Sequence, residues 1–522
     1  SNWLPSIDDV NDKIEFDLSF MFKPGYKILS NGNLDSEMTL FHPQRRIVKY
    51  DMQKPMSSYL VALAIGKYDV KTETSNSGIP LEYYYYPEDS LKVEPTYRYA
   101  KQMFDFLENE IGFAYPWQNY KQVPVHDFLY SGMENTSLTI FSDAFVVDST
   151  GFNDKNYVNV NAHELAHQWF GDLVTATSGE HHWLQEGFAT YYALLAEKEV
   201  FGQDYFDFKL YNSAQDLKRQ DLAGNGTSLL NSKSSSLTFY QRGAWVLYAL
   251  RDKVGDGVFR NAIKGYLEKH QYANVKTSDF ISEVETRYGK PLIGFVSKWI
   301  EAEEFPFNDA VVLLKESSTF IQEYVMVDCE ANSSKCEDYL KYYVSDDAKV
   351  KVISQRPDLV SVATFSESLK VRQAISQFVT KIPGELKENY ESLLNDKSYL
   401  TIESALYNLW INFPLERSKY LSKTKNIHGF NDKNVRLLWL VLALNTLEFQ
   451  SENNNAFLKE LLAYTEASQN FELRINAFTY LDLIKACDAE CQSNLEQAKS
   501  HHNWRMSKFV KEMLSQLNNP KN

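Results

Sequence analysis

The sequence predicts an α+β protein of several domains, in which an antiparallel β region at the N-terminus is followed by a longer, mostly helical remainder. The length of 522 residues exceeds the roughly 250–300 residues that one hydrophobic core can organise. Near the N-terminus apolar and polar residues alternate with a period of two, which is typical of half-buried strands. Beyond about residue 90 the apolar residues recur at helical spacing instead.

The first domain, residues 1–88, is predicted to be an antiparallel β domain. The alternation runs over Lys13–Lys23, and Asn31-Gly32 supplies the chemistry of a tight turn. The short apolar runs Tyr59–Ile65 and Leu81–Tyr85 fit buried strands.

The second domain, residues 89–308, is predicted to be mostly helical. Apolar residues have helical spacing in five of its stretches: Tyr97–Glu110, Val160–Gly171, Trp183–Val200, Gln241–Val254 and Val258–His270. The third domain, residues 309–522, has the pattern of helix after helix with short polar joints. A loose helical repeat of the HEAT or armadillo kind and an irregular helical bundle both fit, since no strict period is present.

Composition and patterning argue against two kinds of partner. The chain has 69 acidic and 54 basic residues, giving a formal net charge of −15. It has no basic run of the kind that nucleic-acid binding needs, so no nucleic-acid partner is expected. The longest apolar run, Leu437–Leu444, is far shorter than the roughly 20 residues of a membrane-spanning helix, so no membrane span is expected. The oligomeric state is not indicated.

The four cysteines fall as two close pairs, Cys329 with Cys336 and Cys487 with Cys491. These separations suit short loops closed by disulfides, which form in oxidising compartments. The alternative is four reduced thiols that serve as small core residues. We favour disulfides, and with them a periplasmic or secreted location over a cytoplasmic one.

The segment that indicates chemistry is His163-Glu164-Leu165-Ala166-His167. On a helix, positions i and i+4 lie on one face, so two imidazoles can bind one metal ion. Zinc accepts such nitrogen ligands, and Glu164 sits where a carboxylate can reach a water at the metal. After the interval 168–185 comes Glu186, at the start of a helical stretch. Two histidines and this glutamate would leave zinc an open position for water.

These residues, with two further segments, resemble the gluzincin aminopeptidases, the zinc peptidase family of aminopeptidase N and leukotriene A hydrolase. His163–Gly171 and Glu186 resemble the family's zinc signature, Ser131–Asn135 its exopeptidase motif, and Tyr240 its catalytic tyrosine. The resemblance is good from residue 1 to about 305. It implies a thermolysin-like catalytic domain that binds one zinc ion per chain through His163, His167 and Glu186.

The resemblance also implies a role for each of the other site residues. Glu164 would be the general base, and Glu134 would pair with the free ammonium group of the substrate. The backbone around Gly132 and Met133 would hold the extended main chain of the substrate. Tyr240 would donate a hydrogen bond to the oxyanion of the tetrahedral intermediate. The implied function is a zinc aminopeptidase whose partners are peptides with a free N-terminus.

The sequence departs from the family's pattern at several positions. Ser131 replaces a glycine of the exopeptidase motif, and Asp172 stands where many members have asparagine. His181 and His182 replace the usual residues before Trp183, and they lack ligand spacing, so we expect them beside the site or at the surface. The resemblance begins partway through the family's N-terminal β domain. We therefore expect a truncated or processed chain whose first domain has exposed sheet edges.

Three other functions compete with this interpretation. The resemblance implies that epoxide hydrolysis on the same scaffold uses an acidic residue shortly before the tyrosine, and Leu222–Phe239 contains none. An endopeptidase would gain nothing from Glu134, because an internal peptide has no ammonium group. An inactive scaffold that binds a partner would not need every zinc, base, amine and oxyanion residue that the sequence retains.

The predicted C-terminal domain carries no chemistry that the sequence identifies. Arg474 and Arg505 are weak candidates for binding the carboxylate of the substrate, and we expect both to be surface charges. The side-chain preference of the substrate depends on residues far apart in the sequence and is not indicated.

Overall fold

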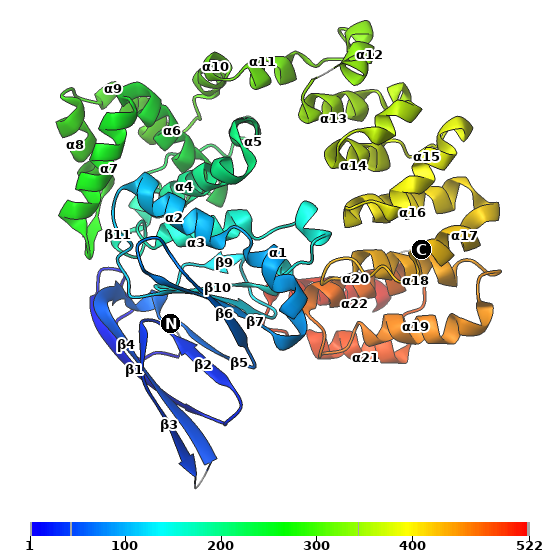
Figure 1. The fold of residues 1–522 in the computed structure, drawn as a ribbon, viewed down its shortest axis with the longest axis horizontal. Helices are drawn as coiled ribbons and strands as arrows, with labels where there is room; N and C mark the ends of the chain where they lie inside the picture. The colour runs from blue at the N-terminus through cyan, green and yellow to red at the C-terminus, as the bar shows by residue number, and fades with distance from the viewer. Residues whose placement is uncertain (1–2, 42–43, 343, 519–522) are drawn as a thin grey trace. The chain divides into compact units, whose positions relative to one another are not determined.

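The computed structural model describes residues 3–41, 44–342 and 344–518 (Figure 1). A β-rich region is followed by a mostly helical remainder, which confirms the α+β class. The chain forms two compact units. Unit 1 holds the residues up to 125 together with 130–142 and 157–321, and unit 2 holds 126–129, 143–156 and the residues from 322 onward. The three-domain boundaries at 88 and 308 stay a prediction.

The predicted antiparallel β region lies in unit 1. The strands of a three-stranded sheet, ordered β1-β4-β3, are β1 (Lys13–Phe22), β3 (Asn33–Phe41) and β4 (Gln44–Ser57). A separate antiparallel pair is formed by β2 (Lys27–Ser30) and β5 (Leu63–Gly66). The turn at Asn31-Gly32 is confirmed, because Gly32 has a φ of +78° and a Cβ there would lie 2.1 Å from the carbonyl oxygen of Asp51.

The prediction of one strand over Tyr59–Ile65 is wrong in its first half. A 3₁₀ turn over Ser58–Leu60 precedes β5, which begins only at Leu63. The side chain of Asn31 is the reason. Its amide nitrogen donates to the carbonyl of Leu60 at 3.1 Å, and its amide oxygen accepts from the N–H of Ala62 at 2.7 Å. These backbone groups are thereby satisfied outside any β ladder.

Unit 1 also contains a five-stranded sheet of which the sequence indicated only Leu81–Tyr85. Its order is β6-β7-β8-β10-β9, and its strands are β6 (Asp69–Thr74), β7 (Pro80–Tyr85), β8 (Tyr120–Val125), β9 (Gly132–Met133) and β10 (Leu138–Ser142). Strand β8 escaped notice because polar residues such as Lys121 and Gln122 are buried in it, which removes the apolar pattern of a core strand.

The five predicted helical stretches of unit 1 are confirmed to within a few residues. They correspond to α2 (Ala100–Ile111), α3 (Val158–His167), α4 (Trp183–Phe201), α6 (Gly243–Val254) and α7 (Asp256–His270). The unit also contains α1 (Val93–Tyr97), α5 (Gln203–Leu222), α8 (Thr277–Tyr288), α9 (Ile293–Val296) and α10 (Phe307–Ser317). Strands β11 (Val174–Ala176) and β12 (Ala273–Val275) pair in parallel.

A π-helical turn, Thr238–Arg242, leads directly into α6. Helix α4 packs against both α3 and α6, and every residue from Trp183 to Glu197 is buried. The turn also packs against α4, at its first residues. Helix α4 is thus the central element on which the elements of the candidate site converge.

Unit 2 is built almost entirely of helices, as the sequence predicts. After α11 (Thr319–Met326), which crosses the unit boundary, they are α12 (Ser333–Lys341), α13 (Asp346–Gln355), α14 (Leu369–Phe378), α15 (Lys387–Ser392), α16 (Tyr399–Asn412), α17 (Arg417–Thr424), α18 (Asn434–Leu444), α19 (Asn454–Ala463), α20 (Phe471–Leu483), α21 (Ala489–Ala498) and α22 (Trp504–Asn518). Helix α14 packs on α16, α16 on α18 and α18 on α20, so alternate helices form a stack (Figure 1).

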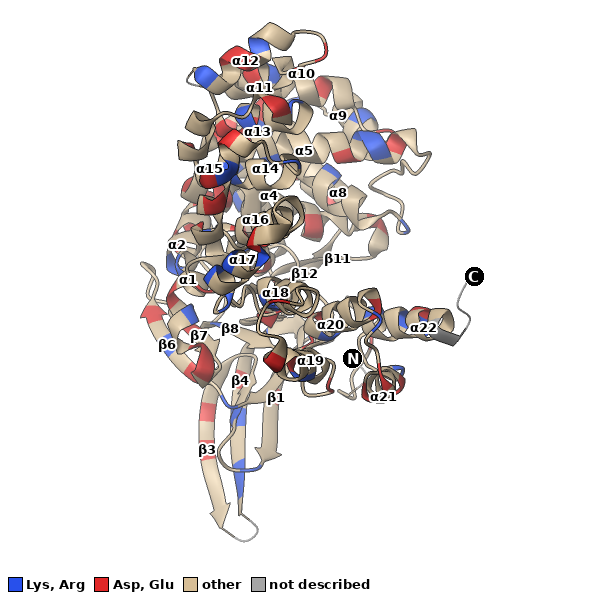
Figure 2. Ribbon diagram, turned by 90° about the vertical axis from the view of Figure 1, so that its right-hand side faces the viewer, with Lys and Arg blue, Asp and Glu red and all other residues tan. Residues whose placement is uncertain are grey.

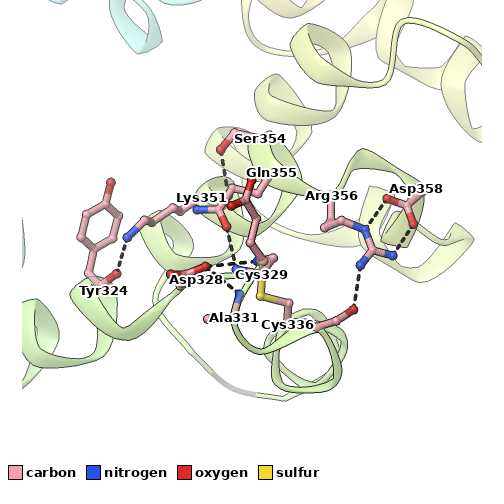
Figure 3. The surroundings of a disulfide bond; sticks show 12 residues. Tyr324, Asp328, Cys329, Ala331, Cys336, Lys351, Ser354, Gln355, Arg356 and Asp358 are labelled. Carbon is pink, nitrogen blue, oxygen red and sulfur yellow. Dashed lines mark hydrogen bonds and ion pairs between the residues drawn. A yellow bond between two sulfur atoms is a disulfide. The ribbon is translucent and has the colours of Figure 1, made fainter.

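Both cysteine pairs are disulfide-bonded in unit 2, Cys329 to Cys336 and Cys487 to Cys491, which is the alternative that we favoured. Figure 3 shows the first of them. Its two cysteines are buried, and the N–H of Cys329 donates to the side-chain oxygen of Gln355 at 2.8 Å. The short loop after α11 is therefore tied to α13 by a hydrogen bond as well as closed on itself by the disulfide.

Lys and Arg are interspersed with Asp and Glu along the helices (Figure 2). Among the described residues, no helix is both long and apolar enough to cross a membrane.

Of the two arginines considered as carboxylate ligands, Arg505 lies at the surface as expected and Arg474 does not. The expectation that Arg474 is a surface charge is wrong. It is fully buried on α20, where its guanidinium donates to the carbonyl of Thr465 and to the side chain of Gln497, because neighbouring helices supply acceptors that the sequence does not place. Arg505 is exposed.

We expect the close approach of α4 and α6 to be sensitive to a single methyl group. A Cβ added at Gly187 would lie 2.7 Å from the Cα of Gly243. Gly187→Ala should therefore lower the stability of the protein by about 1–3 kcal/mol, as overpacking does, measured by thermal or denaturant unfolding. Gly257, on α7, has open space around its missing Cβ. Gly257→Ala should leave the stability unchanged or raise it, and equal effects of the two variants would contradict this packing argument.

Candidate metal and peptidase site

Three side chains from two packed helices converge on one point in unit 1. Helix α3 contributes His163 and His167, and α4 contributes Glu186. The two Nε2 atoms lie 3.1 Å apart, and the Oε2 of Glu186 lies 3.3 Å from that of His163 and 3.2 Å from that of His167. Ligand atoms about 2.0–2.1 Å from a tetrahedral zinc ion are separated by similar distances. The donor set and its spacing therefore fit zinc.

Neighbouring groups contact two of the three donors and orient them. The Nδ1–H of His167 donates to the carbonyl of Phe170 at 2.8 Å, which leaves the Nε2 lone pair directed into the cluster. The Nε2 of His182 lies 3.4 Å from the second carboxylate oxygen of Glu186. His181 instead contacts the hydroxyl of Thr277 at 3.1 Å. Of the two adjacent histidines, only His182 contacts a candidate ligand.

The electrostatics of the cluster favour a cation at its centre. Burial lowers the pKa of His163, so its imidazole is neutral and can serve as a ligand. Burial alone would raise the pKa of Glu186, but His167 and His163 hold it well below its usual range. Burial alone would lower the pKa of His167, but Glu186 and Glu134 raise it well above its usual value. Burying several carboxylates close together is costly unless a positive charge lies beside them.

Glu164 and the exopeptidase motif are in close contact. Glu164 follows His163 on α3 and is buried, and a Cβ added at Gly132 would lie 2.4 Å from its Oε1. The backbone of β9 can therefore approach this carboxylate only because residue 132 is glycine. Ligand-type atoms of Glu134, Glu164 and His167 all lie within 4.8 Å of one another. Burial raises the pKa of both glutamates.

Strand β9 places the motif at the edge of the five-stranded sheet. Met133 pairs with Ile140 and Gly132 with Phe141, both on β10. The carbonyl of Glu134 accepts a hydrogen bond from the side-chain amide of Gln168, at the end of α3, at 3.1 Å. In the described sheet β9 is the terminal strand, so its outer edge presents backbone groups to which an extended peptide can pair.

Tyr240 approaches the metal cluster from the π-helical turn. Its ring stacks on that of His163, with centroids 5.4 Å apart and planes inclined by 4°. Burial and the nearby carboxylate of Glu186 raise its pKa, so the phenol keeps its proton and can donate it in a hydrogen bond. The structure thus brings together all eight residues that the sequence singled out.

Two further residues, Tyr59 and Asp172, lie beside the site, and the sequence assigned neither of them a role in it. Tyr59 is half-buried, its hydroxyl accepts a hydrogen bond from the side-chain amide of Gln185 at 3.3 Å, and desolvation together with Glu134 raises its pKa. Asp172 is fully buried, and burial and Glu134 raise the pKa of its carboxyl well above the usual value. The resemblance of the segment around Tyr59 to the family was the only signal that could have indicated it.

Metal binding provides a test of this geometry that does not depend on activity. We expect the protein to bind one zinc ion per chain, measured by metal analysis after dialysis and by calorimetric titration. His167→Ala should abolish stoichiometric binding because it removes one of three donors. His182→Ala removes only a contact to Glu186 and should keep the stoichiometry while weakening affinity by about 10- to 100-fold. Unchanged zinc affinity in His167→Ala would show that the ion binds elsewhere.

Comparison with known proteins agrees with this arrangement. Residues 96–299 match the model of the peptidase family M1 domain. Glutamyl aminopeptidase of Bos taurus is 29% identical over 349 residues, which cover 63% of this chain and 36% of that protein. Aminopeptidase M1 of Arabidopsis thaliana is 28% identical over 298 residues, covering 54% and 32%.

The chain spans about a third of the length of these curated relatives. Among solved structures, an M1 zinc metallopeptidase from Deinococcus radiodurans is 24% identical with a TM-score of 0.49, over 58% of this chain and 67% of that one. The matched segment contains all the candidate metal ligands, the exopeptidase motif and Tyr240. Within this chain, the segment 96–299 is therefore similar to the peptidase family M1 domain, and it holds the whole candidate site.

Proposed function

We propose that this chain is the catalytic part of a zinc aminopeptidase, which removes the first residue of peptides that have a free N-terminus. The observation that carries the proposal is the position of Glu134. Its carboxylate lies within 4.8 Å of ligand-type atoms of Glu164 and His167. A carboxylate so close to the metal cluster can pair with a substrate ammonium only if the scissile bond follows the first residue.

In this proposal each residue of the site has one role in peptide hydrolysis. Zinc, when bound by His163, His167 and Glu186, supplies a Lewis acid. Glu164 takes a proton from the attacking water and returns it to the leaving amine, for which a raised carboxyl pKa is suitable. Tyr240 donates a hydrogen bond to the oxyanion. The outer edge of β9 aligns the substrate main chain.

The rival functions fit this site less well. An endopeptidase would leave the carboxylate of Glu134 covered by substrate without a cationic partner, which is costly. Epoxide hydrolysis would need an acidic group shortly before Tyr240, and the segment Leu222–Phe239 has none. The names of the curated relatives, glutamyl aminopeptidase and aminopeptidase M1, also support aminopeptidase activity.

The direct test is hydrolysis of a panel of aminoacyl chromogenic amides, each paired with its N-acetylated twin, with and without a zinc chelator. We expect cleavage of the free-amine forms alone and its loss on chelation. Equal cleavage of the acetylated twins would favour an endopeptidase, and absence of any cleavage would favour an inactive scaffold. The panel would also rank the side-chain preference.

A single substitution separates amine recognition from the rest of the site. Glu134→Gln should lower kcat/KM for free-amine substrates by about 100-fold, since a charge-assisted hydrogen bond to a buried ammonium is worth roughly 1.5–3 kcal/mol or more. Glu197, another buried carboxylate on α4, bonds Asn159 and Tyr205. It lies three helical turns beyond Glu186, about 16 Å along the axis. Glu197→Gln should change kcat/KM little; if Glu134→Gln behaves the same way, Glu134 does not bind the amine.

We further propose an oxidising compartment, periplasmic or extracellular, as the site of action. The support is the pair of disulfides in unit 2, because such bonds persist where thiols are not kept reduced. Alkylation of the protein in its native cells, followed by denaturation and mass measurement, should leave all four cysteines unmodified. Four alkylated cysteines would instead indicate a reducing compartment.

A further inference from the structure

We propose that Arg242 is a positioning residue, which holds the phenol of Tyr240 in place beside the metal cluster; the inference rests on the function proposed above. Both residues belong to the π-helical turn Thr238–Arg242, Tyr240 at its centre and Arg242 at its end. Tyr240 is the member of the site that lies on this turn, rather than on α3, α4 or β9. Its position depends on what fixes the turn.

The guanidinium of Arg242 is 1% exposed and binds two other segments of the chain. One is the loop at residue 227 and the other is the segment 299–303, which follows α9. Its Nε donates to the carbonyl of Trp299 at 3.2 Å, Nη1 to those of Thr227 at 3.0 Å and Glu303 at 2.9 Å, and Nη2 to that of Ala302 at 2.6 Å. Because the guanidinium is planar, four acceptors around it fix its orientation as well as its position.

The positive charge of Arg242 strengthens its hydrogen bonds to these carbonyl oxygens. Burial lowers its pKa to about 10, with Asp221 acting in the opposite direction, so the side chain stays cationic at neutral pH. A buried cation that leaves its acceptors would lose several hydrogen bonds at once, which is costly. The turn is therefore held firmly on the side of residues 227 and 299–303.

Helix α4 closes the opposite side of the same turn. Gly243 follows Arg242 directly, and a Cβ added at Gly187 would lie 2.7 Å from its Cα and 3.3 Å from the carbonyl oxygen of Phe239. Gly187 in turn follows the candidate ligand Glu186. The turn is thus enclosed between the helix that carries a metal ligand and the segments that Arg242 binds, and little movement of Tyr240 relative to the cluster is possible.

Arg242→Lys tests this role because lysine keeps the charge but has one donor nitrogen and cannot span four carbonyls. We expect kcat on aminoacyl amides to fall about 10- to 100-fold, as for loss or displacement of an oxyanion donor. KM and the zinc content should stay near the wild-type values. Combining it with Tyr240→Phe should lower kcat little beyond Tyr240→Phe alone, because both changes remove the same hydrogen bond.

Arg474→Lys is the matched control, since Arg474 is an equally buried arginine bonded to a backbone carbonyl, on α20 of unit 2. It should lower the melting temperature without a selective loss of kcat.

A wild-type kcat in Arg242→Lys, or multiplicative effects in the double variant, would overturn the inference. If Arg242→Lys does not fold, Gly243→Ala displaces the same turn from its other side and should give the same kcat-selective loss. Failure of the wild-type protein to cleave any free-amine substrate would instead refute the proposed function.

Discussion

The constraint on which the site depends is the burial of several ionisable side chains around one point. Glu134, Glu164 and Glu186 face the two histidines of α3 in a region largely closed to solvent. Separating such groups from water is costly unless charge of the opposite sign lies beside them. A divalent cation between the histidines and Glu186, and a substrate ammonium at Glu134, would each supply it. The same groups that make this cluster unfavourable when empty therefore suit it to the two cations that the proposed function requires.

Rigid elements bring these groups together. Helices α3 and α4 pack closely, and each brings its ligands to the same end of the contact. Strand β9 pairs with β10, and the carbonyl of Glu134 that follows it accepts a hydrogen bond from Gln168, so the proposed amine-binding residue is fixed relative to both the sheet and α3. Glycines permit two contacts that any side chain would prevent, one between Gly132 and Glu164 and one between Gly187 and Gly243. Sites built on packed elements keep the sub-ångström precision that catalysis needs.

Prediction from the sequence succeeded where a pattern is local and failed where partners are distant. The HExxH spacing places two histidines on one helix face by geometry alone, and helix α4 was recognised from the helical spacing of its apolar residues. Strand β8 was missed because Lys121 and Gln122 are buried in it, and the run beginning at Tyr59 was misassigned because Asn31, far back in the sequence, binds its backbone. Arg474 was expected at the surface because its carbonyl partners belong to segments that the sequence does not mark.

The sequence by itself determined the class of chemistry. It contains the donor atoms, their spacing along α3, the glutamate that follows on α4, and the exopeptidase motif. Only the tertiary structure decided that Gly132 must lack a side chain beside Glu164, that Tyr240 stacks on His163, and that Arg242 is bound to four carbonyls. The physical reason is that ligand geometry within one helix follows from its fixed rise and turn per residue. The distance between separate elements is instead set by side-chain packing and by hydrogen bonds between segments far apart in the sequence, and these contacts exist only once the chain has folded.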